Sequence, residues 1–220
     1  MSRQRDVVQR DVVRELVRAH GTTLAEEAGI TLRDTPQPLY RLLVLAVLLS
    51  ARIRASVAVA TARELHRAGL RDPRRMAAAD WQERVDALGR GGYRRYDERT
   101  ATQLGDGAEL LIERWGGDLR RMRAEAHGEA AGLRRLLQEV PGMGPTGADI
   151  FLREVQDVWP ETAPYLDRKA LAGAERLGLP ADPDRLVELA GDVRPAVLAA
   201  GLVRAARDKE VAEDSLRRAV

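Results

Sequence analysis

Apolar residues recur every three to four positions along most of this chain, which is the spacing of one face of an α-helix. Residues 7–19 show it clearly, with apolar side chains at Val8, Val12, Val13 and Leu16. Residues 42–49 are instead apolar at every position, which is typical of a helix buried on all sides. No stretch alternates between apolar and polar residues over a useful length, so the pattern predicts an all-α protein.

Proline and aspartate residues indicate where several helices begin. Pro38 can occupy the first position of the helix that contains residues 42–49, because proline is tolerated there. Asp72, which precedes a proline, and Asp80 are expected to be N-cap residues. Two more helices are predicted over residues 183–190 and 195–208, each beginning at a proline.

The most informative pair of helices lies in residues 133–158, where two apolar faces flank Pro141-Gly142-Met143-Gly144. Pro141 is expected to stop the first helix, and the two glycines allow backbone conformations that a side chain would forbid. The first N–H groups of the second helix have no partner inside that helix and can bind a phosphate oxygen. These features predict a helix-hairpin-helix that binds DNA backbone. The faces consist of Leu133, Leu136, Leu137 and Val140, then Ile150, Phe151, Val155 and Val158.

The segment LLQEVPGMGPTGADIFL around this turn resembles the hairpin of the endonuclease III superfamily of DNA glycosylases, where the turn reads Leu-Pro-Gly-Val-Gly. LLVLAVLLSA, residues 42–51, is similar to the family helix that ends in Leu-Leu-Ser-Ala-Gln. Residues 91–119 are similar to the family's Gly-Leu-Tyr to Gly-Gly stretch, and residues 159–179 to the segment with its essential aspartate. The four matches follow the family order and cover roughly residues 38–180.

The resemblance implies a two-lobed helix-hairpin-helix fold with a central cleft. Residues 33–157 would form a helical barrel lobe that contains the hairpin. Residues 1–32 and 158–220 would form the second lobe, which carries Asp167. The implied activity is that of a DNA N-glycosylase in base excision repair, which hydrolyses the base–sugar bond of a damaged or mismatched base flipped out of double-stranded DNA.

Asp167 stands where the family has its catalytic aspartate. Cleavage of a base–sugar bond has an oxocarbenium-like transition state, which a nearby carboxylate stabilises while it orients or deprotonates a water molecule. Asp167 also precedes a predicted helix, so it can equally be an N-cap residue, and both roles are compatible. The spacer after the hairpin is slightly longer than the usual family pattern, with Pro164-Tyr165 near the aspartate.

Bifunctional members of the family carry a lysine just after the hairpin glycines, whose amine forms a Schiff base with the sugar. Thr146 occupies the matching position here, and a threonine cannot form an imine. Its hydroxyl can instead cap the helix or contact a phosphate. Lys169 lies two residues past Asp167, so it would point roughly 200° away on a helix, and Lys209 is far along the chain. We therefore expect a monofunctional enzyme without β-lyase activity.

The expected DNA contacts come from the hairpin and from two arginines. Arg52 takes the place of a family glutamine that fills the gap left by the flipped base; it is either such a plug or a solvated residue at a helix end. Tyr93, Tyr96 and Trp115 could stack on a base, or belong to the packed interior. The full set of expected DNA-binding residues is Gly142, Met143, Gly144, Thr146, Gly147, Arg52 and Arg168.

No metal cofactor is expected. The chain has no cysteine, so it cannot hold by thiolates the iron–sulfur cluster that many family members carry. Its three histidines are scattered, without the spacing of a transition-metal site. The resemblance implies that the backbone carbonyls of Val140 and Met143 can bind a monovalent cation. No dinucleotide-binding, P-loop or serine-hydrolase motif is present.

Charge and composition add little to this interpretation. The formal net charge is only +2, and the basic residues are almost all arginines, which suit phosphate contacts but also result from a GC-rich genome. The first residues are charged and polar, no apolar run reaches the ~20 residues of a membrane span, and we expect a cytoplasmic monomer without membrane contact. The alternative function is a helix-hairpin-helix protein that binds DNA and has lost catalysis.

Overall fold

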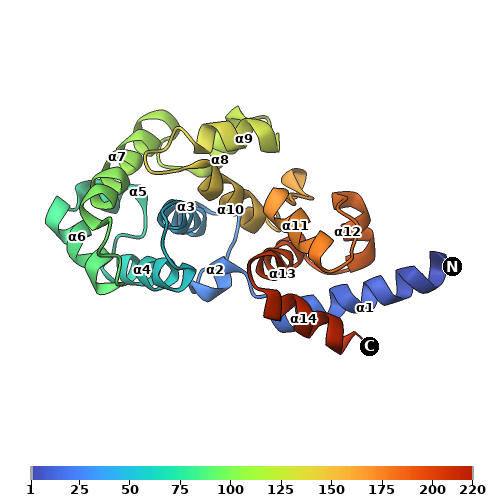
Figure 1. Ribbon diagram of the computed structural model, residues 1–220. Coiled ribbons are helices and arrows are strands. Elements are labelled where there is room, and N and C mark those ends of the chain that lie inside the picture. Colours follow the sequence, from blue (N-terminus) through green and yellow to red (C-terminus); the bar gives the residue numbers. More distant parts are fainter. Residues whose placement is uncertain (1, 220) are drawn as a thin grey trace. The chain divides into compact units, whose positions relative to one another are not determined.

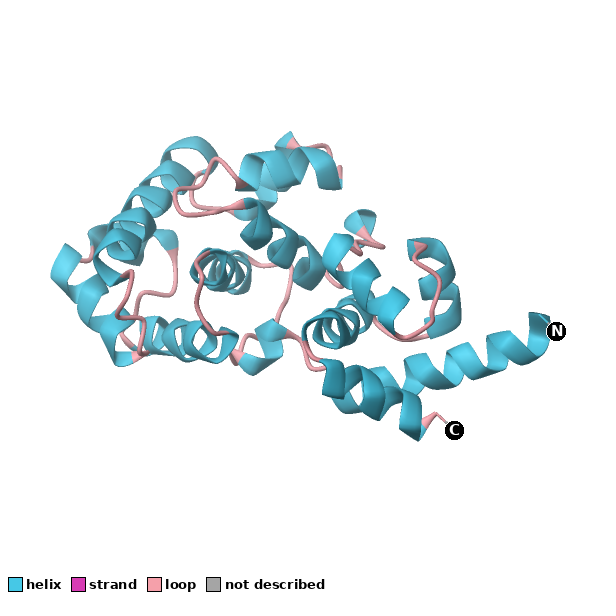
Figure 2. Cartoon of the chain, viewed as in Figure 1, coloured by secondary structure: helices cyan, strands magenta, loops and turns pink. Residues whose placement is uncertain are grey.

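The computed structural model describes residues 2–219, with side chains from residue 4 onward. Every regular element in this range is a helix, which confirms the predicted all-α class (Figure 2). The chain folds into two compact units, residues 24–161 and residues 1–23 with 162–220. None of the helices in the described range combines the length and the apolarity needed to cross a membrane.

The larger unit is organised around α3 (Pro36–Ser50), whose residues 42–49 are all buried as the continuous apolar run predicts. α3 packs most extensively against α10, and α4 and α8 also pack on it (Figure 1). A second group of packed helices consists of α7 with α5 and α6. The other elements are α2 (Leu24–Glu27), α4 (Ala55–Arg67), α5 (Pro73–Ala78), α6 (Trp81–Arg90), α7 (Asp97–Trp115), α8 (Leu119–Glu125), α9 (Ala130–Leu137) and α10 (Pro145–Val155). The 3₁₀ helix η1 (Pro160–Thr162) crosses the unit boundary, which lies between residues 161 and 162.

Side-chain hydrogen bonds explain where the larger unit begins and ends. The backbone N–H groups of Leu24 and Ala25 donate to the carboxylate of Glu154 in α10, at 3.1 and 2.8 Å. Trp159 lies beyond α10, yet its ring packs on Phe151 and its Nε1 donates to Asp34 at 2.9 Å. These interactions attach both ends of the segment to its core, so the unit spans residues 24–161, whereas the resemblance implied a lobe at residues 33–157.

The smaller unit consists of α1 (Ser2–His20) and four helices from the last third of the chain. α13 lies between α11 and α1, and α1 runs beside α14 (Figure 1). Val12, Val13 and Leu16 of α1 are buried in this core, whereas Val8 is exposed although it belongs to the same apolar pattern. The remaining helices are α11 (Arg168–Arg176), α12 (Pro183–Ala190), α13 (Pro195–Arg207) and α14 (Lys209–Arg218).

The local start signals are largely confirmed. The carboxylates of Asp72 and Asp80 cap α5 and α6, and α12 and α13 begin at the predicted prolines. The expectation that Pro38 opens α3 is wrong, because the helix begins at Pro36. Pro36 can begin the helix for the same reason as Pro38, since its missing N–H would have no intrahelical partner at that position.

Candidate nucleic-acid interface

Helices α9 and α10 form a hairpin on the core of the larger unit. The predicted apolar face of α9 and the turn after it, from Leu133 to Val140, is buried at every position. In the predicted face of α10, Ile150, Phe151 and Val155 are buried as well. Two details differ from the prediction: α9 ends at Leu137, before Pro141, and Val158 lies beyond the end of α10. Arg134 of α9 and Asp149 of α10 form an ion pair at 2.6 Å that joins the two helices beside the turn.

Gly142 gives the turn its direction. Its φ is +84°, which lies in the left-handed region that residues with a side chain rarely adopt. A Cβ atom there would also lie 2.9 Å from Oε1 of Gln103 on α7. Gly144, in contrast, is extended with φ −81° and ψ 174°, and a Cβ atom on it would have ordinary room. The expectation that both glycines of the turn need a special conformation is therefore wrong for Gly144.

Gly147 has a different importance, because it allows α10 to approach α3 closely. A Cβ atom on Gly147 would lie 2.0 Å from Oγ of Ser50 and 2.7 Å from the carbonyl oxygen of Ala46. These distances are too short for any larger residue unless the two helices move apart. Gly147 is thus needed to seat the hairpin on α3.

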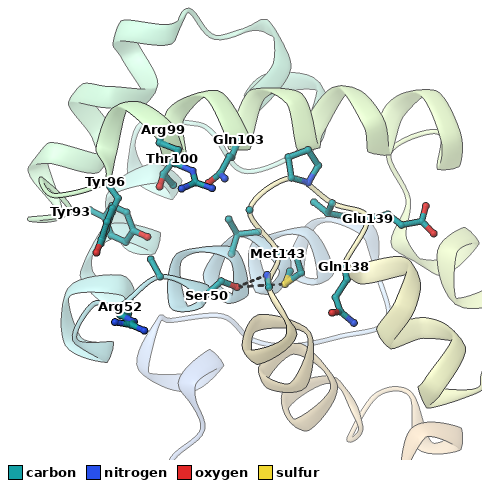
Figure 3. Close-up of a pocket in the computed structure, with 16 residues that line it drawn as sticks. Ser50, Arg52, Tyr93, Tyr96, Arg99, Thr100, Gln103, Gln138, Glu139 and Met143 are labelled. Atoms are coloured by element: carbon teal, nitrogen blue, oxygen red, sulfur yellow. Dashed lines mark hydrogen bonds between the residues drawn. The ribbon is translucent and has the colours of Figure 1, made fainter.

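Ser50, the last residue of α3, also holds the turn by a hydrogen bond (Figure 3). Its Oγ donates to the carbonyl oxygen of Ala46 at 3.0 Å and accepts from the N–H of Gly144 at 3.2 Å. Inside the turn, the N–H of Met143 donates to the carbonyl oxygen of Val140 at 2.9 Å. The N–H of Gly144 therefore already has a protein partner, and the Val140 carbonyl accepts one hydrogen bond before any cation is considered.

The N-terminus of α10 offers the remaining donors of the hairpin. Its N-cap residue, Gly144, has no side chain to cap it, and Pro145 at the first position has no N–H. The first helical bond runs from the N–H of Ala148 to the carbonyl oxygen of Gly144, so the N–H groups of Thr146 and Gly147 have no partner within the helix. Thr146 is exposed and adds its hydroxyl. This is the arrangement that suits a phosphate oxygen.

A pocket of about 530 Å³ opens beside the turn. The loop from Gln138 to Gly144 forms one side, and the end of α3, the loop before α7 and the first turns of α7 form the others (Figure 3). The structure thereby brings Arg52 and the hairpin glycines to one cavity. The other lining residues are Val47, Ser50, Ala51, Tyr93, Tyr96, Arg99, Thr100 and Gln103, with Glu139, Val140, Pro141 and Met143 inside the loop.

The pocket carries two arginines that are available to an anion. Arg52 and Arg99 are both exposed, and neither forms an ion pair with any residue between 4 and 219. Arg99, Thr100 and Gln103 lie on one side of α7 and point toward the hairpin loop (Figure 3). The sequence did not single out these three residues, because the likeness of residues 91–119 to the family lies in the two ends of that stretch and the three residues stand between them. Ser50 was part of the quoted segment 42–51, but nothing in the sequence gave its side chain a role.

The three aromatic residues considered for base stacking have different surroundings. Tyr93 is 1% exposed, and its hydroxyl donates to the carbonyl oxygen of Leu48 at 3.1 Å. Burial raises the pKa of its phenol, and the residue lines the pocket. Tyr96 is half-buried and lies under the guanidinium of Arg95, 5.3 Å from the ring centroid. Trp115 is buried away from the pocket, with Nε1 donating to Glu125.

Asp167 lies in the smaller unit, at the start of α11. Its Oδ1 accepts a hydrogen bond from the N–H of Ala170 at 3.0 Å, so the carboxylate caps this helix. The side chain is half-buried, whereas Arg168 and Lys169, the next two residues, are exposed. The capping role that the sequence allowed is therefore present, and a catalytic role would be additional to it.

No group of three or more histidine, cysteine, aspartate or glutamate residues that could hold a metal ion occurs between residues 4 and 219. The monovalent cation expected at Val140 and Met143 would use backbone carbonyls instead, and it stays a prediction. Comparison of the chain with models of protein families, with curated proteins and with solved structures finds no match in any of the three. The resemblance to endonuclease III-like glycosylases therefore depends only on the residues quoted from the sequence.

Proposed function

We propose that this protein is a monofunctional DNA glycosylase of the endonuclease III-like helix-hairpin-helix superfamily, with a two-lobed fold. The observation that carries the proposal is the N-terminus of α10, which follows the left-handed turn at Gly142 and has no side-chain cap. Backbone donors in this setting bind phosphate without regard to sequence. Arg52 and Arg99 beside the same turn add positive charge that suits a DNA backbone.

In the proposed reaction, Asp167 stabilises the positive charge that develops on the sugar as the bond to the base breaks, and it orients the attacking water. Asp167 would act in this way in addition to accepting the hydrogen bond from the N–H of Ala170. The position that carries the lyase lysine in bifunctional enzymes is Thr146. Hydrolysis of the base would therefore leave an intact abasic site.

The second candidate is a DNA-binding protein without catalysis. The cap formed by Asp167 favours it, because the residue has a structural function that does not require chemistry. Both candidates predict sequence-independent DNA binding that weakens with rising salt. They differ in whether any base is released.

The test is a panel of labelled duplexes that carry uracil, alkylated, oxidised or mismatched bases. The glycosylase proposal expects strand breaks at one class of lesion only after alkali, and no covalent adduct with borohydride. A borohydride-trapped adduct would overturn the monofunctional assignment, and Lys169→Ala would show whether Lys169 forms it. Binding without base release on every lesion would favour the second candidate, and a protein that binds none of the duplexes would refute both.

A further inference from the structure

Glu139 presents an electrostatic problem for the proposed phosphate site. It lies two residues before Pro141, in the loop that lines the pocket, and its side chain is 41% exposed. A carboxylate this close to a phosphate-binding turn would repel DNA if its side chain turned toward the turn. In the structure it points away from the pocket (Figure 3).

Arg114, near the end of α7, holds Glu139 in that direction. One arm of its guanidinium forms an ion pair with Glu139 and the other with Glu125 of α8. The guanidinium also lies over the ring of Trp115, 4.5 Å from the centroid. Arg114 is therefore fixed on three sides and does not depend on Glu139 for its position.

Glu125, the other partner of Arg114, is also held by a buried residue of the larger unit, Trp115. Trp115 is 2% exposed, and its Nε1 donates to Glu125 at 2.6 Å. Glu125 thus keeps a hydrogen bond if Arg114 is lost, whereas the ion pair with Arg114 is the one interaction of Glu139's side chain within residues 4–219. Removal of the guanidinium would accordingly free Glu139 more than Glu125.

We propose that Arg114 is a positioning residue for DNA binding, which keeps the carboxylate of Glu139 away from the phosphate-binding turn of the hairpin. The inference rests on the proposed function, because it requires that the turn meets a phosphate. Its effect is electrostatic. Loss of Arg114 lowers DNA affinity because the negative charge of Glu139 is freed, and a neutral residue at position 139 restores the affinity.

The experiment measures the affinity of the full chain for a labelled duplex by fluorescence anisotropy at low salt. Arg114→Gln should weaken binding by about 5-fold, since an unscreened carboxylate then faces phosphate. Glu139→Gln alone should bind at least as well as wild type. The double variant Arg114→Gln/Glu139→Gln should return to wild-type affinity, and high salt should reduce the differences among the variants.

A matched control separates this role from a structural one. Arg114→Gln/Glu125→Gln neutralises the other partner of the same arginine and should not restore binding. If the ion pair merely ties the loop to α7, Glu139→Gln alone would weaken binding as much as Arg114→Gln, and this result would overturn the inference. Unchanged binding by Arg114→Gln would overturn it as well. A wild type that binds no DNA would refute the proposed function itself, whereas a DNA-binding wild type with an inert Arg114 series would refute the positioning role alone.

Discussion

Two helix N-termini carry the proposed function, and they are built in opposite ways. α10 follows Gly144, which offers no side-chain cap, so the first N–H groups of the helix are left to an external acceptor. α11 follows Asp167, whose carboxylate accepts from the N–H of Ala170 and satisfies the helix from within. The comparison indicates that the first terminus is suited to bind an anion, while the second already contains one.

The strongest test of this difference is the charge at Asp167. Asp167→Asn should keep the cap, because asparagine caps helices about as well as aspartate. It should nevertheless reduce base release by about 100-fold or more, since an amide stabilises a cationic sugar poorly. Single-turnover rates on the lesion found in the panel, with binding measured in parallel, would check this.

A matched control lies in the same unit. Asp182 caps α12 by accepting from the N–H of Arg185 at 2.8 Å, and Asp182→Asn should leave base release unchanged. Wild-type rates for Asp167→Asn would remove Asp167 from the proposed mechanism and reduce it to a cap.

The next test concerns the entry to α10. Gly142→Val forces a side chain into the left-handed region and against Gln103, so the turn must change. We expect duplex affinity to fall by about 10-fold for all sequences alike, because backbone donors at a helix N-terminus do not read bases. Anisotropy titrations with two unrelated duplexes would measure both the loss and its uniformity.

Gly144→Ala is the control for that variant. Gly144 is extended, and a Cβ atom on it would lie 3.9 Å from that of Ser50, an ordinary contact. The Gly144→Ala variant should therefore bind DNA about as well as wild type. A loss at Gly144 as large as that at Gly142 would mean that access to the backbone of Gly144, and not the left-handed turn, limits binding.

The smallest expected effect is at Ser50, which accepts from the N–H of Gly144. Ser50→Ala should lower the free energy of unfolding by about 1 kcal/mol, as the loss of one hydrogen bond does, and weaken DNA binding slightly. Ser215→Ala is the control, because the Oγ of Ser215 also donates to a carbonyl four residues earlier, at 2.8 Å, but in the smaller unit. If both variants changed DNA binding equally, the bond from Gly144 would have no special part in the interface.

The sequence by itself determined the features that arise within a few residues. Apolar spacing predicted the helices around residues 7–19, 42–49 and 133–158, and the caps at Asp72, Asp80 and Asp167 followed from aspartates placed before helical segments. The glycine at position 142 indicated a turn of unusual backbone conformation, and its φ agrees. These features could be predicted because hydrogen bonds of caps and turns join residues three or four positions apart.

Only the tertiary structure decided which distant residues complete the candidate interface. The bond from Gly144 to Ser50 joins residues 94 positions apart, that from Tyr93 to Leu48 spans 45, and that from Arg114 to Glu139 spans 25. The sequence placed Gly144 beside Gly142 as a second glycine of unusual conformation. Nothing in the local sequence shows that Gly144 is extended or that its N–H donates to a serine of α3. Such pairs depend on how helices pack against one another, and helix packing depends on side chains from every part of the unit at once.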